Sequence, residues 1–126
     1  MNSTRTPAGV DWAVLALDLG GTQVRAAVVR GDGTVVIRRR TRTPVEDGGE
    51  AIVQACLDAL QACRDAHAAA GSATELVGIG IATPGPVDPI RGWVIDPPNL
   101  GPSFHDTPLA ERARASLGLP AFLDRD

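Results

Sequence analysis

The sequence contains no lysine and no tyrosine, and only two tryptophans and two phenylalanines among its 126 residues. The missing lysine excludes the common phosphate-binding loop Gly-x-x-x-x-Gly-Lys-Ser/Thr, in which the ammonium group contacts the phosphates. No apolar run approaches the roughly 18 residues that a membrane-spanning helix needs. Residues 1–12 also lack the hydrophobic segment of a secretory signal. These absences predict a cytoplasmic protein without a membrane partner.

The charge and the cysteine content narrow the class of protein further. Twelve basic residues, all arginine, stand against 15 acidic ones, and the net charge of -3 gives no general attraction to nucleic acid. A hydrophobic content of 44% over this length suffices for one globular domain. Cys56 and Cys63 lie seven residues apart in an alanine-rich stretch, which places both on one helix face and too far apart for a disulfide. Two cysteines alone do not make a zinc site, so they are predicted to be small core residues.

The most informative segment is residues 16–28, where Asp18 and the pair Gly20-Gly21 stand between two apolar runs. This pattern predicts a strand, a tight turn and a second strand. The glycines let the backbone approach a ligand, while the Thr22 hydroxyl and free amides can face phosphate oxygens. A carboxylate that ends an apolar run is costly to bury unpaired, so Asp18 is expected to face a cleft and could hold Mg²⁺ through water. An ordinary hairpin is the alternative, because Gly-Gly is itself a turn signal.

The rest of the chain predicts one α/β domain of three layers over residues 13–126, after a flexible tail at 1–12. The first three strands should be antiparallel, because the turns between them are too short for crossovers. Arg38, Arg40 and Arg42 share one face of the third strand, interpreted as a solvated edge. His67 is expected on the helix surface or in its last turn. The predicted strands are 13–19, 24–30, 34–42, 75–82 and 120–124, with a short segment at 92–96 and helices at 49–70 and 106–117.

Four motifs occur in a set order: Asp18-Leu-Gly-Gly-Thr22, Gly78-Ile-Gly-Ile-Ala-Thr-Pro-Gly-Pro-Val-Asp88, Pro98-Asn99-Leu100 and Leu119-Pro-Ala-Phe-Leu-Asp-Arg-Asp126. Together they resemble the N-terminal domain of the ROK family of bacterial sugar kinases and related repressors. The first motif is shared by the wider actin, hexokinase and Hsp70-like ATPase superfamily. The element Thr-Pro-Gly-Pro-Val-Asp followed by Pro-Asn-Leu is far more specific.

The resemblance implies a ribonuclease H-like fold and a glucokinase-like transferase that moves the γ-phosphate of ATP to a hexose hydroxyl. It implies ATP and Mg²⁺ as cofactors, a hexose as substrate and a homodimer of the full-length form. It places Asp126 as the catalytic base and as a sugar contact. The other residues it assigns are Asp18, Gly20, Gly21 and Thr22 at the phosphates and Mg²⁺, and Pro84, Gly85 and Asn99 at the sugar.

Three departures bear on this interpretation. Arg125 stands where the family has an asparagine before the base, and could depress the basicity of Asp126 or contact a substrate phosphate. Gln23 replaces a common lysine or asparagine. The chain stops at Asp126, before the family's zinc-binding cluster and second domain, so this chain is expected to hold no zinc and to be inactive alone. The alternatives are the sugar-sensing part of a ROK-type transcriptional regulator and a non-catalytic binding module.

Overall fold

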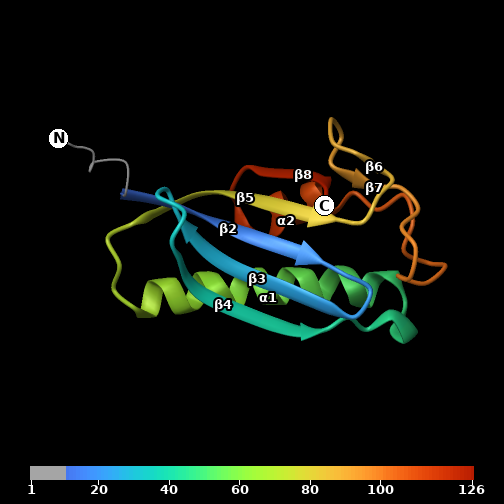
Figure 1. Ribbon diagram of the computed structural model, residues 1–126, viewed down its shortest axis with the longest axis horizontal. Helices are drawn as coiled ribbons and strands as arrows, with labels where there is room; N and C mark the ends of the chain where they lie inside the picture. The colour runs from blue at the N-terminus through green and yellow to red at the C-terminus, as the bar shows by residue number, and fades with distance from the viewer. Residues whose placement is uncertain (1–10) are drawn as a thin grey trace.

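The computed structural model describes residues 11–126, which form a five-stranded sheet with two helices on one of its faces (Figure 1). The sheet order is β4-β3-β2-β5-β8. Neighbours β2, β3 and β4 are antiparallel, whereas β5 and β8 run parallel to β2. The strands are β2 (Trp12–Leu19), β3 (Gln23–Arg30), β4 (Val35–Arg42), β5 (Glu75–Thr83) and β8 (Ala121–Arg125).

The helices and short elements connect these strands. The main helices are α1 (Gly49–Ala69) and α2 (Leu109–Leu117), and a short 3₁₀ helix, η2 (Val45–Asp47), precedes α1. A small hairpin of β6 (Val87–Asp88) and β7 (Trp93–Val94) lies between β5 and α2. No helix within residues 11–126 is long and apolar enough to cross a membrane.

The core lies between the sheet and the helices. Strand side chains alternate between the two faces of a sheet, and Leu15, Leu17 and Val28 are among those buried against the helices. Cys56 and Cys63 are buried in the same cluster, as predicted. Burial raises the pKa of the Cys56 thiol to about 12.

The predicted fold class and the antiparallel start of the sheet are confirmed. Each predicted strand end lies within one residue of the observed one. Of the flexible tail expected at residues 1–12, residues 1–10 lie outside the described residues, and β2 begins at Trp12.

Two details of the prediction were wrong. The described residues form two layers and not three, because α1 and α2 pack side by side on one face, joined by the ion pair of Arg112 and Glu50. The second helix begins at Leu109 and not at residue 106, because Thr107 forms a β-bridge with Val94 and Pro108 precedes the helix. His67 lies in the last turn of α1, one of the two positions expected for it, and is buried, with its Nε2 atom 2.7 Å from the Thr74 carbonyl oxygen.

Candidate functional site

The candidate site lies at one edge of the sheet, where three parallel strands end. Asp18 of β2 lies across from Ala82 of β5, and Ala82 lies across from Asp124 of β8. The amide of Asp126 then donates a hydrogen bond of 3.0 Å to the Thr83 carbonyl oxygen. Ligands of α/β sheets bind outside the carboxyl ends of parallel strands. Asp18 and Asp126, far apart in the sequence, therefore come to the same edge.

Thr43 forms hydrogen bonds to the turn between β2 and β3. The Gly20 amide closes the turn by donating to the Gln23 carbonyl oxygen at 2.9 Å. The buried Thr43 donates its hydroxyl to the Gly20 carbonyl at 2.7 Å and its amide to the Thr22 carbonyl at 2.8 Å. Both carbonyls thus point toward Thr43. A hollow of about 290 Å³ opens at the turn, lined by Asp18, Gly20, Gly21, Thr22, Gln23 and Arg25.

The Pro98-Asn99-Leu100 loop packs directly against this turn. A Cβ atom added to Gly21 would lie 3.0 Å from both the Cβ and the carbonyl oxygen of Asn99. Asn99 itself has a φ of 66°, a left-handed conformation that asparagine tolerates better than most residues. The structure therefore brings the turn predicted for phosphate and the loop predicted for sugar into contact.

The Pro84-Gly85 segment follows β5 at the same edge and is covered by Arg125. A Cβ atom at Gly85 would lie 2.9 Å from Cδ of Arg125. Among the described residues, Arg125 forms no ion pair within 4 Å, so it is not paired with Asp126. The long side chain of Arg125 thus lies over Gly85.

The sequence analysis missed two residues that shape the site, Thr43 and Arg25. Arg25 lies across from Asp18 in the strand pair, and its Nη1 atom is 3.7 Å from Oδ2 of Asp18. Its Nη2 atom donates to the Gln23 side-chain oxygen at 3.2 Å. Arg25 lies two residues after Gln23, so both side chains lie on one face of the strand. This spacing could have indicated that Arg25 lies at the site. Thr43 had no sequence signal, since its role depends on the fold.

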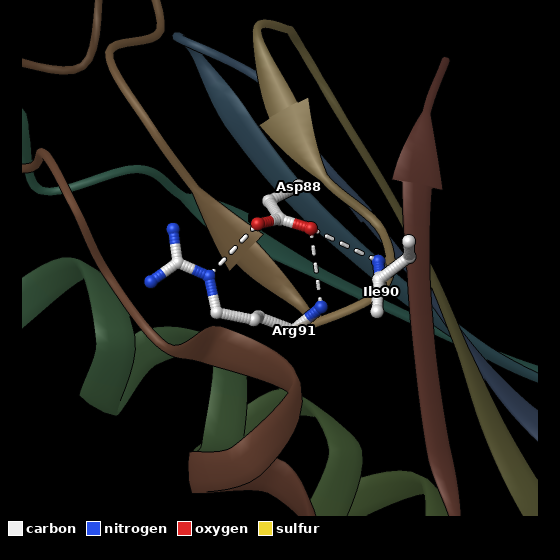
Figure 2. A network of polar contacts seen from close by, with 3 residues as sticks. All are labelled: Asp88, Ile90 and Arg91. Carbon is white, nitrogen blue, oxygen red and sulfur yellow. Dashed lines mark hydrogen bonds and ion pairs between the residues drawn. The ribbon is translucent and has the colours of Figure 1, made fainter.

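The β6–β7 hairpin stands beside the site and is organised by one carboxylate. In Figure 2, Asp88 accepts hydrogen bonds from the Ile90 amide at 3.1 Å, the Arg91 amide at 3.2 Å and the Arg91 Nε atom at 2.8 Å. The Arg91 guanidinium also lies 4.3 Å from the ring centre of Trp93. The hydrogen bonds from Arg91 hold the pKa of Asp88 below its usual value.

The residues at this edge fit Mg²⁺ as a bound ion. The Asp18 side chain is 51% exposed, and it forms an ion pair with Arg25 at 3.7 Å. Mg²⁺ binds through one or two carboxylates and keeps several waters alongside substrate phosphates. An open carboxylate beside a turn of free amides meets that requirement.

Known proteins match this chain closely. The sequence pattern of the ROK family matches residues 14–126. The glucokinase of Streptomyces coelicolor is 32% identical over 112 residues, which are 89% of this chain and 32% of that protein. A putative xylose repressor of Caldicellulosiruptor sp. is 26% identical over 113 residues, 90% of this chain and 27% of the repressor. Kinases and a repressor are thus both among the relatives.

Solved structures agree with the sequence matches. The ROK hexokinase of Thermus thermophilus has a TM-score of 0.73 and 33% identity, covering 90% of this chain and 35% of the hexokinase. A ROK family glucokinase from Streptomyces griseus, solved with glucose and AMPPNP, has a TM-score of 0.75 and 26% identity, covering 90% of this chain and 33% of the glucokinase. The chain thus spans about a third of the length of these relatives. With its sheet, its glycine turn and nearly its whole length matched, the chain belongs to the ROK family.

Proposed function

We propose that this chain is the N-terminal portion of an ATP-dependent hexose kinase of the glucokinase type. The γ-phosphate of ATP would pass to a hydroxyl of the sugar, in the cytoplasm, and the full-length protein would act as a homodimer. The glucokinase and hexokinase among the relatives support this reaction. The Streptomyces griseus relative, with glucose and a nucleotide bound, supports both ligand classes.

The observation that carries the proposal is that Asp18, Asp126 and two loops lie at the same edge of the sheet, where the parallel strands end. Gly20, Gly21 and Thr22 would receive the phosphates at the hollow of the turn. Asn99, packed on Gly21, would hold the sugar beside them, together with the backbone at Pro84 and Gly85. Phosphoryl transfer depends on positioning the two substrates and neutralising charge, and contact between the two loops serves that need.

Asp126 would act as the base of the reaction and also contact the sugar. Its backbone is fixed by the hydrogen bond to the Thr83 carbonyl. A carboxylate within hydrogen-bond reach can accept the proton of the sugar hydroxyl as that oxygen attacks phosphorus. Mg²⁺, when bound through Asp18, would neutralise phosphate charge.

The test uses the longer polypeptide that carries this sequence. Asp126→Asn should lower kcat by roughly 10² to 10⁴-fold while the sugar affinity stays within a few-fold, because the amide keeps most hydrogen bonds. Asn99→Ala should mainly raise KM for the sugar, because a ground-state contact is lost. The matched control is Asp124→Asn, the same change two residues earlier, which should leave kcat within a few-fold. Full turnover in the Asp126→Asn variant would show that Asp126 is not the base.

The relative named as a xylose repressor favours a second candidate, a sugar-binding regulator without catalysis. Isothermal titration with glucose and with ATP separates the two functions. A kinase binds both ligands and forms a sugar phosphate, whereas a regulator binds the sugar and forms no product. The remaining alternative, a non-catalytic binding module, would bind neither glucose nor ATP.

A further inference from the structure

Arg125 brings a positive charge to the candidate site that no neighbouring group balances. Its side chain lies over Gly85, where an added Cβ atom would be 2.9 Å from Cδ and 3.1 Å from Nε of the arginine. Within residues 11–126, its guanidinium group forms no ion pair and donates no hydrogen bond, although its backbone amide donates to Asp124. The five N–H donors of the guanidinium group are therefore available to a ligand.

Two carboxylates near Arg125 have other partners. Strand β6 contacts β8, but Asp88 of β6 already accepts a hydrogen bond from Nε of Arg91 at 2.8 Å. Asp124 accepts the backbone amide of Arg125 at 2.7 Å. The next residue, Asp126, forms no ion pair within the described part of the chain. These carboxylates leave the charge of Arg125 without a partner.

The position of Arg125 separates it from the turn proposed for the ATP phosphates. The hollow at that turn has its own arginine, Arg25, and Arg125 is not among the residues that line it. Arg125 ends β8, whereas the turn follows β2, and β5 lies between these two strands. Two strand spacings of about 4.8 Å each separate β2 from β8 by about 10 Å. Arg125 therefore lies on the side proposed for the sugar.

A guanidinium group in this position selects for negative charge in the ligand. It is always charged and can only donate hydrogen bonds, so a neutral hydroxyl group leaves its charge unbalanced. A carboxylate or phosphate group can accept parallel hydrogen bonds from it, each roughly twice as strong as a hydrogen bond between neutral groups. The side chain of Arg125 thus favours an anionic sugar over a neutral one.

We propose that Arg125 is a specificity-determining residue that binds a carboxylate or phosphate group of the sugar. This assignment rests on the proposed function, under which the sugar is held by the backbone at Pro84 and Gly85 and by Asp126. Asp126 directly follows Arg125, so a hexose with its acceptor hydroxyl at Asp126 can present a second substituent to the guanidinium group. The substrate is then a hexose with an anionic group away from its acceptor hydroxyl, and glucose is a weaker, neutral analogue.

The experiment is isothermal titration of the longer polypeptide that carries this sequence, at one ionic strength because salt screens charge. Glucose monophosphates with the phosphate on each hydroxyl group in turn move the negative charge around the sugar, and glucose is their neutral counterpart. Glucuronate and glucuronamide differ in charge but have almost the same shape. At least one anionic sugar should bind about tenfold more tightly than its neutral counterpart, the scale of a hydrogen bond to a charged group.

Variants of Arg125 then connect this preference to the guanidinium group. Arg125→Gln removes the charge and should reduce the ratio of the neutral-sugar Kd to the anionic-sugar Kd about tenfold. Arg125→Lys keeps the charge without the planar fork and should retain part of the preference. Arg91→Gln is the matched control, since it removes an arginine beside the site that is already paired with Asp88, and it should leave the ratio unchanged.

Three outcomes would overturn the assignment of Arg125. The first is that no anionic sugar binds more tightly than its neutral counterpart. The second is a preference that persists in the Arg125→Gln variant. The third is that Arg125→Gln weakens binding of the ATP analogue AMPPNP more than binding of the anionic sugar, which would assign Arg125 to the nucleotide.

The titration also separates this assignment from the proposed kinase, because binding does not require catalysis. A polypeptide that phosphorylates glucose but shows no preference for an anionic sugar would refute the assignment and leave the kinase standing. A polypeptide that prefers an anionic sugar through Arg125 but phosphorylates no sugar would refute the kinase and leave the assignment standing.

Discussion

Gly21 is the residue at which the turn between β2 and β3 meets the Pro98-Asn99-Leu100 loop. A methyl group at this position would meet the Cβ and carbonyl oxygen of Asn99 at 3.0 Å, so the loop must move away. We expect Gly21→Ala to destabilise the chain by about 1 kcal/mol, within the common range for single substitutions. In the longer polypeptide, KM for the sugar should rise with it.

Gly80→Ala is the matched control, because its new methyl group meets open space. It should be neutral or stabilising by about 0.5 kcal/mol, since alanine loses less backbone entropy than glycine on folding. Urea unfolding of both variants gives the comparison. Equal stability of Gly21→Ala and Gly80→Ala would show that the loops are free to separate.

Thr43 supports the glycine turn without contacting the hollow itself. Thr43→Val keeps the shape but removes the hydroxyl that donates to the Gly20 carbonyl, leaving this half-buried acceptor unpaired. The expected loss is about 1–2 kcal/mol in the free energy of unfolding. Thr43→Ser keeps the hydroxyl and should recover most of it. If serine and valine variants unfold at the same urea concentration, the hydrogen bond does not hold the turn.

At the scale of elements, the end of β4 is tied to η2 by an exposed ion pair. Arg42 donates two hydrogen bonds to Glu46, and these lower the pKa of Glu46 from its ordinary value of 4.5 to about 2. A lowered carboxyl pKa stabilises the folded state above pH 4.5. This contribution is lost as pH falls from 4.5 toward 2.

Glu46→Gln should therefore lower stability slightly at pH 7 and match the unaltered chain near pH 2. Urea unfolding at the two pH values measures the difference. The effect is small because solvent screens exposed pairs. Asp47→Asn removes a neighbouring carboxylate outside the pair and should not reproduce this pH dependence. A Glu46→Gln difference that persists at pH 2 would assign the effect to packing.

Element types followed from sequence patterns, while some element ends did not. The strand alternation and the apolar spacing of α1 predicted their bounds to within one residue. The start of α2 was predicted three residues too early. The β-bridge between Thr107 and Val94 uses the backbone amide and carbonyl of Thr107, and a pairing across 13 positions has no local sequence signal.

At the scale of the whole molecule, the 126-residue chain presents the carboxyl ends of three parallel strands and an open sheet face. We expect no measurable sugar-dependent ATP hydrolysis from this chain, since its kinase relatives are about three times as long and closure over the substrates excludes water. The open sheet face should also promote self-association. A coupled ADP assay and sedimentation velocity test the two expectations. Robust phosphorylation of a hexose would show that this portion suffices for catalysis.

The sequence by itself determined the strands, the long helix, the glycine turn and the set of motifs that mark the family, because these depend on local alternation and on residues a few positions apart. Only the tertiary structure decided that Asn99 packs on Gly21, that Thr43 holds the turn, and that Arg125 lies over Gly85. It also decided that the helices cover a single face and leave a groove rimmed by Arg25, Arg38 and Arg40. Such contacts join residues 20 to 80 positions apart, and their geometry depends on sheet order and register, which local patterns do not encode.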